Sequence, residues 1–131
     1  MTPPIASPEI QAAYDAFPPE VQSGAMALRA LIYETAKGIS GLPAPTECLR
    51  WGQPSYITPI GSALRIGIPK SGGFALYAHC QSTIISQFAQ GFGADFQIEG
   101  NRAVLFQSQD DIQPEKLRLM IGHALTYKRK K

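Results

Sequence analysis

The chain has 131 residues, of which 44% are hydrophobic and 17% are charged, and its formal net charge at pH 7 is +2. This length and mixture suit one domain, so we expect residues 1–131 to form a single domain with its core between about 8 and 127. No apolar run approaches the roughly 20 residues that cross a bilayer. Met1–Pro4 lacks the basic start of a secretory signal. We therefore expect a cytoplasmic protein that does not bind membranes.

The charges are distributed unevenly along the chain. Residues 1–47 hold five acidic and two basic side chains, a net charge of −3, so residues 48–131 carry +5. Four of the positive charges form the terminal run Lys128–Lys131. No aromatic residue beyond Tyr127 is interleaved with this run, so we interpret it as a solvated helix end and expect no nucleic-acid partner.

Two helices are predicted before residue 45. Ser7-Pro8-Glu9 has the pattern of an N-cap followed by proline at the first helical position, which predicts a short helix ending near Ala16. Pro19-Glu20 begins a longer helix with an apolar stripe made of Val21, Ala25, Leu28 and Ile32. Leu42–Pro45 cannot continue a helix, so the structure is expected to change there.

Short strands are expected from about residue 45 to residue 107. Ala63–Ile68 and Phe74–His79 flank the turn Ser71–Gly73 and predict a hairpin. Phe96–Ile98 and Ala103–Phe106 predict a second one. Both hairpins indicate an antiparallel sheet.

The remaining elements are helical and set the fold class. Ser82–Phe88 is expected as a helical turn, and a final helix begins within Asp110–Glu115. Its apolar stripe consists of Leu117, Met120, Ile121, Ala124 and Leu125. We predict an α+β two-layer sandwich, in which an antiparallel sheet of about five or six strands carries the N-terminal and C-terminal helices on one face. The other face would be open to a ligand or a partner.

Several segments carry a family resemblance: Glu47–Tyr56 with its Trp51-Gly52-Gln53-Pro54-Ser55-Tyr56 motif, the hairpin strand end Tyr77–His79, Asn101–Phe106 and Ile112–Pro114. Together they resemble the YdhG-like domain family, whose function is unknown. The resemblance extends from about residue 10 to residue 127. It implies a fold similar to frataxin and, for some members, a role as an intracellular iron chaperone.

Iron is the alternative cofactor that this resemblance implies. Loose iron binding of the frataxin type uses clustered surface carboxylates. The candidates in the first two helices are Glu9, Asp15 and Glu20, but no two of them have the spacing that brings carboxylates onto one helical face. The densest acidic group, within Asp110–Glu115, is better explained as stabilising a helix start.

Sulfur, imidazole and hydroxyl groups form no recognisable catalytic or metal motif. Cys48 and Cys80 are expected to be free, buried or half-buried thiols. His79 precedes Cys80 on a predicted strand, so the two side chains should point to opposite faces and not share a metal. His123 is expected to be structural. Lys70 presents a cation in a glycine-rich turn, which we interpret as solvated rather than as an anion site.

One set of residues remains as a candidate ligand site: Arg50, Trp51, Tyr56, Arg65, Tyr77 and His79. If they share the open face, an arginine above aromatic rings would form a pocket for a carboxylate or a planar ligand. The competing interpretation packs the aromatic residues beneath the helices. We expect this packing for Trp51, whereas for Tyr56 both interpretations stay open, because Pro54 should confine its strand to an edge or a bulge.

Three functions are compatible with these patterns. A non-enzymatic binding or adaptor domain that uses the open sheet face is preferred, since no catalytic motif is recognised. An iron chaperone is the alternative, and a small enzyme using Arg50, Tyr56 and His79 as acid and base is the third. The partner would be an unknown small molecule or protein. The chain itself would be a monomer or a weak homodimer that associates through a sheet edge.

Overall fold

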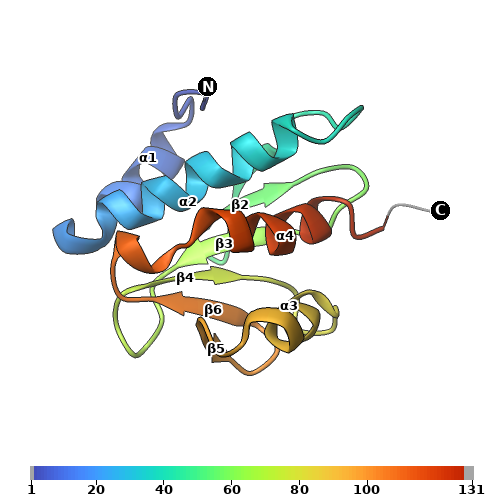
Figure 1. The fold of residues 1–131 in the computed structure, drawn as a ribbon. Coiled ribbons are helices and arrows are strands. Elements are labelled where there is room, and N and C mark those ends of the chain that lie inside the picture. The colour runs from blue at the N-terminus through green and yellow to red at the C-terminus, as the bar shows by residue number, and fades with distance from the viewer. Residues whose placement is uncertain (1, 129–131) are drawn as a thin grey trace.

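The computed structural model describes residues 2–128 and consists of a helical layer on one sheet (Figure 1). Its helices are α1 (Pro8–Asp15), α2 (Pro19–Lys37), α3 (Ile84–Phe92), the short 3-10 helix η1 (Gln109–Asp111) and α4 (Pro114–Leu125). Its strands are β1 (Thr46–Arg50), β2 (Gln53–Ile57), β3 (Leu64–Gly67), β4 (Phe74–Tyr77), β5 (Gln97–Glu99) and β6 (Ala103–Phe106). Arg129–Lys131, most of the basic run, lies outside the described residues.

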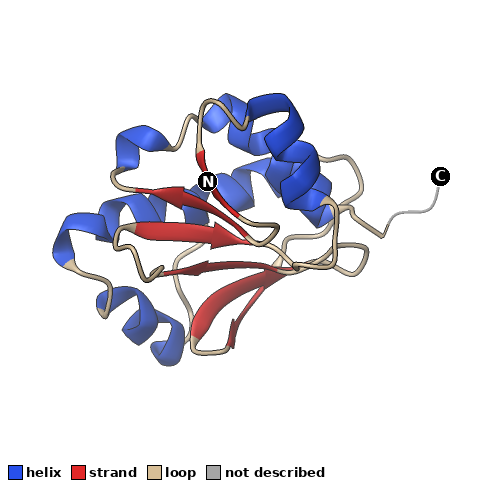
Figure 2. Ribbon diagram, turned by 90° about the horizontal axis from the view of Figure 1, so that it is seen from below, coloured by secondary structure: helices blue, strands red, loops and turns tan. Residues whose placement is uncertain are grey.

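The six strands form one sheet in the order β1-β2-β3-β4-β6-β5, and every neighbouring pair is antiparallel. Figure 2 shows the strands as a single twisted layer. The strands β1 and β5 are its two edges. The predicted α+β class with an antiparallel sheet of five or six strands is confirmed.

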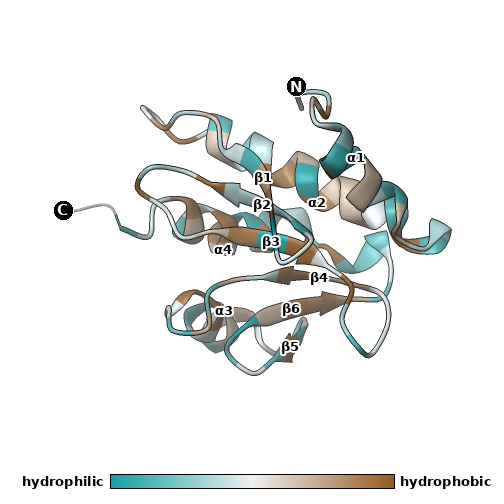
Figure 3. Ribbon diagram, turned by 180° about the vertical axis from the view of Figure 1, so that it is seen from behind, coloured by the Kyte–Doolittle hydropathy of each residue, from teal (hydrophilic) through white to brown (hydrophobic). Residues whose placement is uncertain are grey.

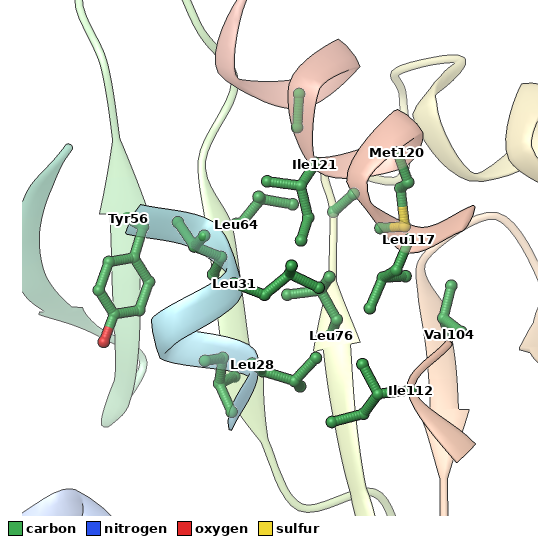
Figure 4. Close-up of a cluster of buried hydrophobic side chains, with 14 of the residues drawn as sticks. Leu28, Leu31, Tyr56, Leu64, Leu76, Val104, Ile112, Leu117, Met120 and Ile121 are labelled. Carbon is green, nitrogen blue, oxygen red and sulfur yellow. The ribbon is translucent and has the colours of Figure 1, made fainter. Parts of the chain in front are cut away.

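The main core lies between the sheet and the helices, as the apolar stripes predict. The helices contribute the fully buried side chains of Leu28, Ile32, Leu117 and Ile121. The sheet contributes Leu64, Leu76 and Val104 from three adjacent strands (Figure 4). Full burial of each such side chain contributes about 1.5–3 kcal/mol, so this layer contact is the main source of stability.

Helix α2 approaches the sheet closely because of a glycine. A Cβ atom at Gly24 would clash with the ring of Phe74 on β4. That ring stacks on Phe106 of β6, with centroids 5.2 Å apart. The predicted start of α1 is also present, since the Ser7 hydroxyl accepts a hydrogen bond of 3.4 Å from the backbone N–H of Ile10.

No described helix covers the opposite face of the sheet, which faces the viewer in Figure 3. A small second cluster packs on this face: Ala75, Tyr77 and Ala103, with Leu105 partly buried beside them. The sheet therefore has one face in the core and one available face, as antiparallel sheets permit. None of the helices in the described part of the chain is long and apolar enough to span a bilayer.

The expectation that Trp51 packs beneath the helices is wrong, because its side chain is 89% exposed. Arg50 pairs with Gln53, which leaves Trp51 and Gly52 as a two-residue turn with φ angles of 56° and 73°. Positive φ at both positions is typical of a type I′ turn, the turn that matches the twist of a tight hairpin. The chain reverses at the tryptophan, which is left at the hairpin tip.

Pro54 does not place its strand at an edge, contrary to expectation, since β2 lies between β1 and β3. Gln53, beside the tight turn, directs its backbone groups toward β1, so Pro54 faces β3. The β2–β3 ladder pairs only Ser55 and Tyr56. The missing proline N–H therefore falls beyond the end of that ladder.

The strand predicted to include His79 is shorter than expected, because β4 ends at Tyr77. The Ser82 backbone N–H donates to the His79 carbonyl at 3.0 Å, and this contact turns the chain toward α3. His79 and Cys80 are consequently exposed in a turn. Both cysteines are free, but only Cys48 is partly buried as predicted.

Candidate functional site

Three neighbouring strands bring Ser55, Arg65 and Tyr77 into one row on the uncovered sheet face. The ladders pair Ser55 with Arg65, and Arg65 with Tyr77. Opposed residues of an antiparallel ladder point to the same face, so these side chains are direct neighbours. Alternation sends the adjacent residues Tyr56 and Leu64 into the helical core, where both are fully buried.

The arginine of this row is held in place from two sides. Its guanidinium carbon lies 5.4 Å from the centroid of the Tyr77 ring, within the range of a cation–π contact. Its Nη1 donates a hydrogen bond of 2.9 Å to Oε1 of Gln53. The glutamine amide occupies space above Gly67, where a Cβ atom would clash with it. The ring of Tyr77 and the side-chain amide of Gln53 therefore orient Arg65. Gly67 leaves room for this amide because it has no side chain.

A cavity of about 410 Å³ opens beside the same tyrosine, and it is lined by Ile68, Pro69, Lys70, Tyr77, Glu99 and Arg102. Arg102 Nε lies 3.1 Å from Glu99 Oε2 in an ion pair whose side chains are 62% and 40% exposed. Such a pair is weakened by water and is readily rearranged. Within the residues that the structure describes, Lys70 forms no ion pair. With Arg65 adjacent, positive charge exceeds negative charge around the ring.

The tyrosine beneath these charges stays neutral at physiological pH. Burial raises the pKa of Tyr77, and the carboxylate of Glu99 raises it further. Arg102 and Arg65 lower the pKa, but the net direction is upward. The ring is therefore an apolar platform with a neutral hydroxyl, which suits stacking rather than proton abstraction.

One polar atom in this row lacks a partner. The hydroxyl of Ser55 is buried and makes no hydrogen bond within the described chain. Its neighbours across the ladders on this face are Cys48 and Arg65. A buried unsatisfied hydroxyl is uncommon in a native protein and marks a place where an additional polar group would be stabilised.

Of the six residues predicted to form a ligand site, Arg65 and Tyr77 are brought together in this way. Arg50 points to the same face but lies exposed at the end of the edge strand. Trp51 is at the hairpin tip. His79 lies beyond the end of β4, where its Nδ1 accepts a hydrogen bond of 3.1 Å from the backbone N–H of Gln81.

The sixth residue, Tyr56, belongs to a separate buried network on the helical side of the sheet. Its hydroxyl donates to Glu47 Oε2 at 2.6 Å and lies 2.6 Å from the hydroxyl of Tyr14. Because a tyrosine has one proton to donate, Tyr14 is the donor of that second bond. Arg29 donates from Nε to Glu47 Oε2 at 2.6 Å and from Nη2 to Oε1 at 3.1 Å. The six predicted residues therefore do not form one site, because Tyr56 points to the opposite face of the sheet from Arg50 and Tyr77.

The network contains a buried ion pair, formed by Arg29 and Glu47. The side chain of Arg29 is 2% exposed and that of Glu47 is 11% exposed. The remaining Nη1 donates to the Pro3 carbonyl at 2.7 Å, and the guanidinium lies 4.9 Å from the Tyr33 ring centroid. Burial lowers the pKa of Arg29, but the hydrogen bond to Glu47 and the attraction of its negative charge together outweigh this effect, so the net pKa is raised. Arg29 therefore stays charged and connects α2, β1 and the N-terminal segment.

Burial is also the main cause that raises the pKa of both buried tyrosines, Tyr14 and Tyr56. The Glu47 carboxylate adds to this effect at Tyr56 through the hydrogen bond that it accepts. Since Tyr56 is fully buried, no ligand reaches its hydroxyl in this conformation. We assign the network a structural role.

Sequence reasoning missed Gln53, Glu99 and Arg102 at the open face, and Arg29 and Tyr14 in the buried network. Arg29 did carry a signal, since it lies between Leu28 and Ile32 on the border of the apolar stripe of α2. No signal in the sequence indicated the cavity, because the sequence alone does not reveal that β6 pairs with β4. This pairing brings the turn between β5 and β6 beside Tyr77.

The carboxylates considered for iron lie on different helical turns. Glu9 and Glu20 occupy the first turns of two different helices. Asp15 accepts a hydrogen bond of 2.9 Å from Gln11, one turn earlier in α1. Asp111 accepts hydrogen bonds from the backbone N–H groups of Gln107 and Ser108 and thereby caps η1, whereas the sequence pattern places this acidic group at the start of the final helix, which begins only at Pro114. Between residues 2 and 128 no group of three or more His, Cys, Asp or Glu side chains could hold a metal ion.

Comparison with known proteins gives no match for this chain among family models, curated proteins or solved structures. The similarity to the YdhG-like family therefore stays a prediction from the sequence.

Proposed function

We propose that this protein is a non-enzymatic binding domain that takes a small carboxylate or planar anion on the uncovered face of its sheet. The observation that supports the proposal is the stacking of Arg65 on Tyr77 at the border of a cavity that also presents Lys70 and Arg102. A guanidinium already oriented by a ring and an amide loses little freedom when it binds an anion. The tyrosine is 7% exposed, so its ring chiefly supports the guanidinium and leaves only a small area to the ligand.

The composition of the cavity also favours binding over catalysis. Its lining combines the apolar side chains of Ile68 and Pro69 with the charged side chains of Lys70, Glu99 and Arg102. Glu99 is paired with Arg102, so an incoming carboxylate would compete for a partly exposed arginine rather than for a buried one. Exchange of one exposed carboxylate for another costs little, which suits reversible binding.

Titration with three small probes tests this proposal through backbone amide signals. Benzoate combines a planar ring with a carboxylate, acetate has the carboxylate alone, and benzamide is a neutral planar analogue. We expect benzoate to shift the signals of residues 64–77 and 99–102 at lower concentration than either of the other probes. Equal shifts with benzoate and benzamide, or shifts confined to other segments, would contradict anion recognition.

A pair of matched variants separates this site from general surface charge. Arg65→Gln removes the stacked guanidinium, and a lost charged hydrogen bond of about 1.5–3 kcal/mol predicts a roughly tenfold or greater loss of benzoate affinity. Arg118→Gln removes an arginine that is 48% exposed on α4, beside Glu34. This control should bind benzoate like the unmodified protein. Similar losses in both variants would overturn the assignment to the uncovered face.

A further inference from the structure

The strand β1 presents an edge that no other segment occupies. It pairs on one side with β2 and is the last strand of the sheet. Within residues 2–128, no backbone hydrogen bond joins β1 to any segment besides β2. Exposed edges are commonly protected by charged side chains, above all lysine, by proline or by a bulge. Thr46–Arg50 contains no proline or lysine and its register with β2 is continuous. Of its two charged residues, Glu47 is paired with Arg29 and Arg50 lies at the end of the strand.

The register of the hairpin fixes which backbone groups point outward from this edge. Arg50 and Gln53 flank a two-residue turn, so they exchange hydrogen bonds with each other. Hydrogen-bonded and non-hydrogen-bonded pairs alternate along an antiparallel ladder, so Cys48 also bonds toward β2. Glu47 and Leu49 lie between these pairs. Their N–H and C=O groups therefore point away from the sheet and are available to another strand.

The same edge exposes apolar surface at an energetic cost. Leu49 is 38% exposed and Trp51 is 89% exposed. Trp51 also has a φ angle of 56°, a conformation that is unfavourable for a bulky side chain. Backbone strain of this kind persists where it serves a site or an interface. No packing inside the chain compensates for it, since the indole is surrounded by solvent.

We propose that β1 pairs antiparallel with β1 of a second copy of this chain, in a two-fold register centred on Cys48. In this register Thr46 opposes Arg50, Glu47 opposes Leu49, and Cys48 opposes its own counterpart. All five residues of β1 are paired in this register. Glu47 of one copy and Leu49 of the other form hydrogen-bonded pairs through their outward N–H and C=O groups.

The side chains are compatible with this pairing. No like charges are directly opposed, and Glu47 is already neutralised by Arg29, so its carboxylate does not face Leu49 as a free charge. Trp51 lies just beyond the last paired residue, beside Thr46 of the second copy. A two-fold axis perpendicular to the sheet also places both uncovered faces on the same side, so the paired copies would present two anion sites together.

Cys48, at the centre of this register, allows the pairing to be tested by cross-linking. Cys48 forms a non-hydrogen-bonded pair with its counterpart, in which the Cα atoms lie about 4.5 Å apart. A disulfide spans Cα separations of roughly 4.4–6.8 Å, so the two thiols can be cross-linked without moving the strands. Cys80 is the more exposed of the two cysteines and serves as the matched control.

Oxidation of single-cysteine variants tests the register. Cys80→Ser keeps Cys48, and Cys48→Ser keeps Cys80. Oxidised glutathione accepts two electrons and two protons from a pair of thiols, which leaves one inter-chain disulfide and two reduced glutathione molecules. We expect the variant that retains Cys48 to form the disulfide dimer several-fold faster, although that thiol is less exposed. Equal rates, or faster dimer formation through Cys80, would overturn the proposal.

Sedimentation of the reduced protein tests the pairing without any cross-link. The average mass of the unmodified protein should rise toward that of a dimer with increasing concentration. Leu49→Lys places a charge on the edge and should abolish this rise, whereas Leu119→Lys, at a residue that is 62% exposed on α4, should not. Circular dichroism checks that both variants are folded. A mass independent of concentration in the unmodified protein, or equal losses in the two variants, would contradict the interface.

Discussion

Glu47 and Tyr56 face each other across the β1–β2 ladder, and the tyrosine hydroxyl donates a 2.6 Å hydrogen bond to the glutamate carboxylate. This pair anchors the hairpin to the helices, because the same carboxylate accepts two hydrogen bonds from Arg29 of α2. The Trp-Gly turn is consequently held at a fixed place on the sheet edge. The buried network thus positions a hairpin whose tip and edge are exposed.

Replacement of Tyr56 by phenylalanine should destabilise the protein by about 1–3 kcal/mol, since Glu47 and Tyr14 each lose a buried hydrogen-bond partner. Urea unfolding followed by circular dichroism measures this change. Tyr127→Phe is a suitable control, because Tyr127 is a partly exposed tyrosine whose hydroxyl bonds to the exposed backbone N–H of Thr83. Equal losses in the two variants would show that the buried network contributes no more than a surface contact.

The buried tyrosines also predict a dependence of stability on alkaline pH. The pKa values of Tyr14 and Tyr56 are raised above the ordinary value of 10.0 in the folded state. Folding therefore favours the protonated phenols, and this contribution is fully present below pH 10 and is lost as the pH rises above that value. Each such group should lower the free energy of unfolding by about 1.4 kcal/mol per pH unit above 10. Unfolding between pH 9 and 11 should show a shallower decline in Tyr56→Phe than in the unmodified protein.

Substitution of Gly67 by alanine should weaken anion binding while preserving the fold. The new Cβ would displace the side-chain amide of Gln53, which then no longer orients Arg65. Because the displaced group is a flexible side chain, the free energy of unfolding should change by no more than about 1 kcal/mol. Gly91→Ala on α3 is the control, since a Cβ there meets nothing within 4 Å. Unchanged benzoate affinity in Gly67→Ala would contradict the role of Gln53.

Substitution of Trp51 by asparagine should stabilise the isolated chain by about 1 kcal/mol, because asparagine tolerates the left-handed conformation that this turn requires. No packing is lost, since the indole is 89% exposed. Urea unfolding followed by circular dichroism at low protein concentration measures the effect. A loss of stability would show that the exposed indole makes a favourable contact within its own chain.

Addition of ferrous iron under anaerobic conditions should leave the amide signals of Glu9, Asp15 and Glu20 unchanged. These carboxylates lie on separate helical turns, and a hard cation needs several oxygen ligands at once. Localised shifts or broadening at these three residues would instead favour the iron chaperone that the sequence resemblance implies.

The helices and the fold class were predictable because their signals are local. Proline at the first position of α1, α2 and α4 and the spacing of apolar residues such as Leu28 and Ile32 depend on positions only a few residues apart. The candidate site was only partly predictable. Arg65 and Tyr77 belong to one hairpin, so their proximity follows from the chain, whereas Arg102 joins them only because β6 pairs with β4.

The burial of individual aromatic side chains was not predictable from the sequence. Trp51 and Tyr56 occupy the same hairpin, yet the first is exposed and the second is fully buried. Composition and motif treat them alike, because each is a large amphipathic side chain. Trp51 is exposed because it lies in the tight turn, whereas Tyr56 is buried because strand alternation directs its side chain toward the helices.

The sequence by itself determined the α+β class, the order of helices and strands, and the apolar surfaces that meet in the core. Only the tertiary structure decided that Tyr56 joins Arg29 and Glu47 inside, that Arg65 lies on Tyr77 outside, and that β1 is left as an edge. The physical reason is the range of the interactions. Helical and turn preferences act between near neighbours, whereas the pairing of β1, β4 and β6 depends on contacts between segments far apart in the chain.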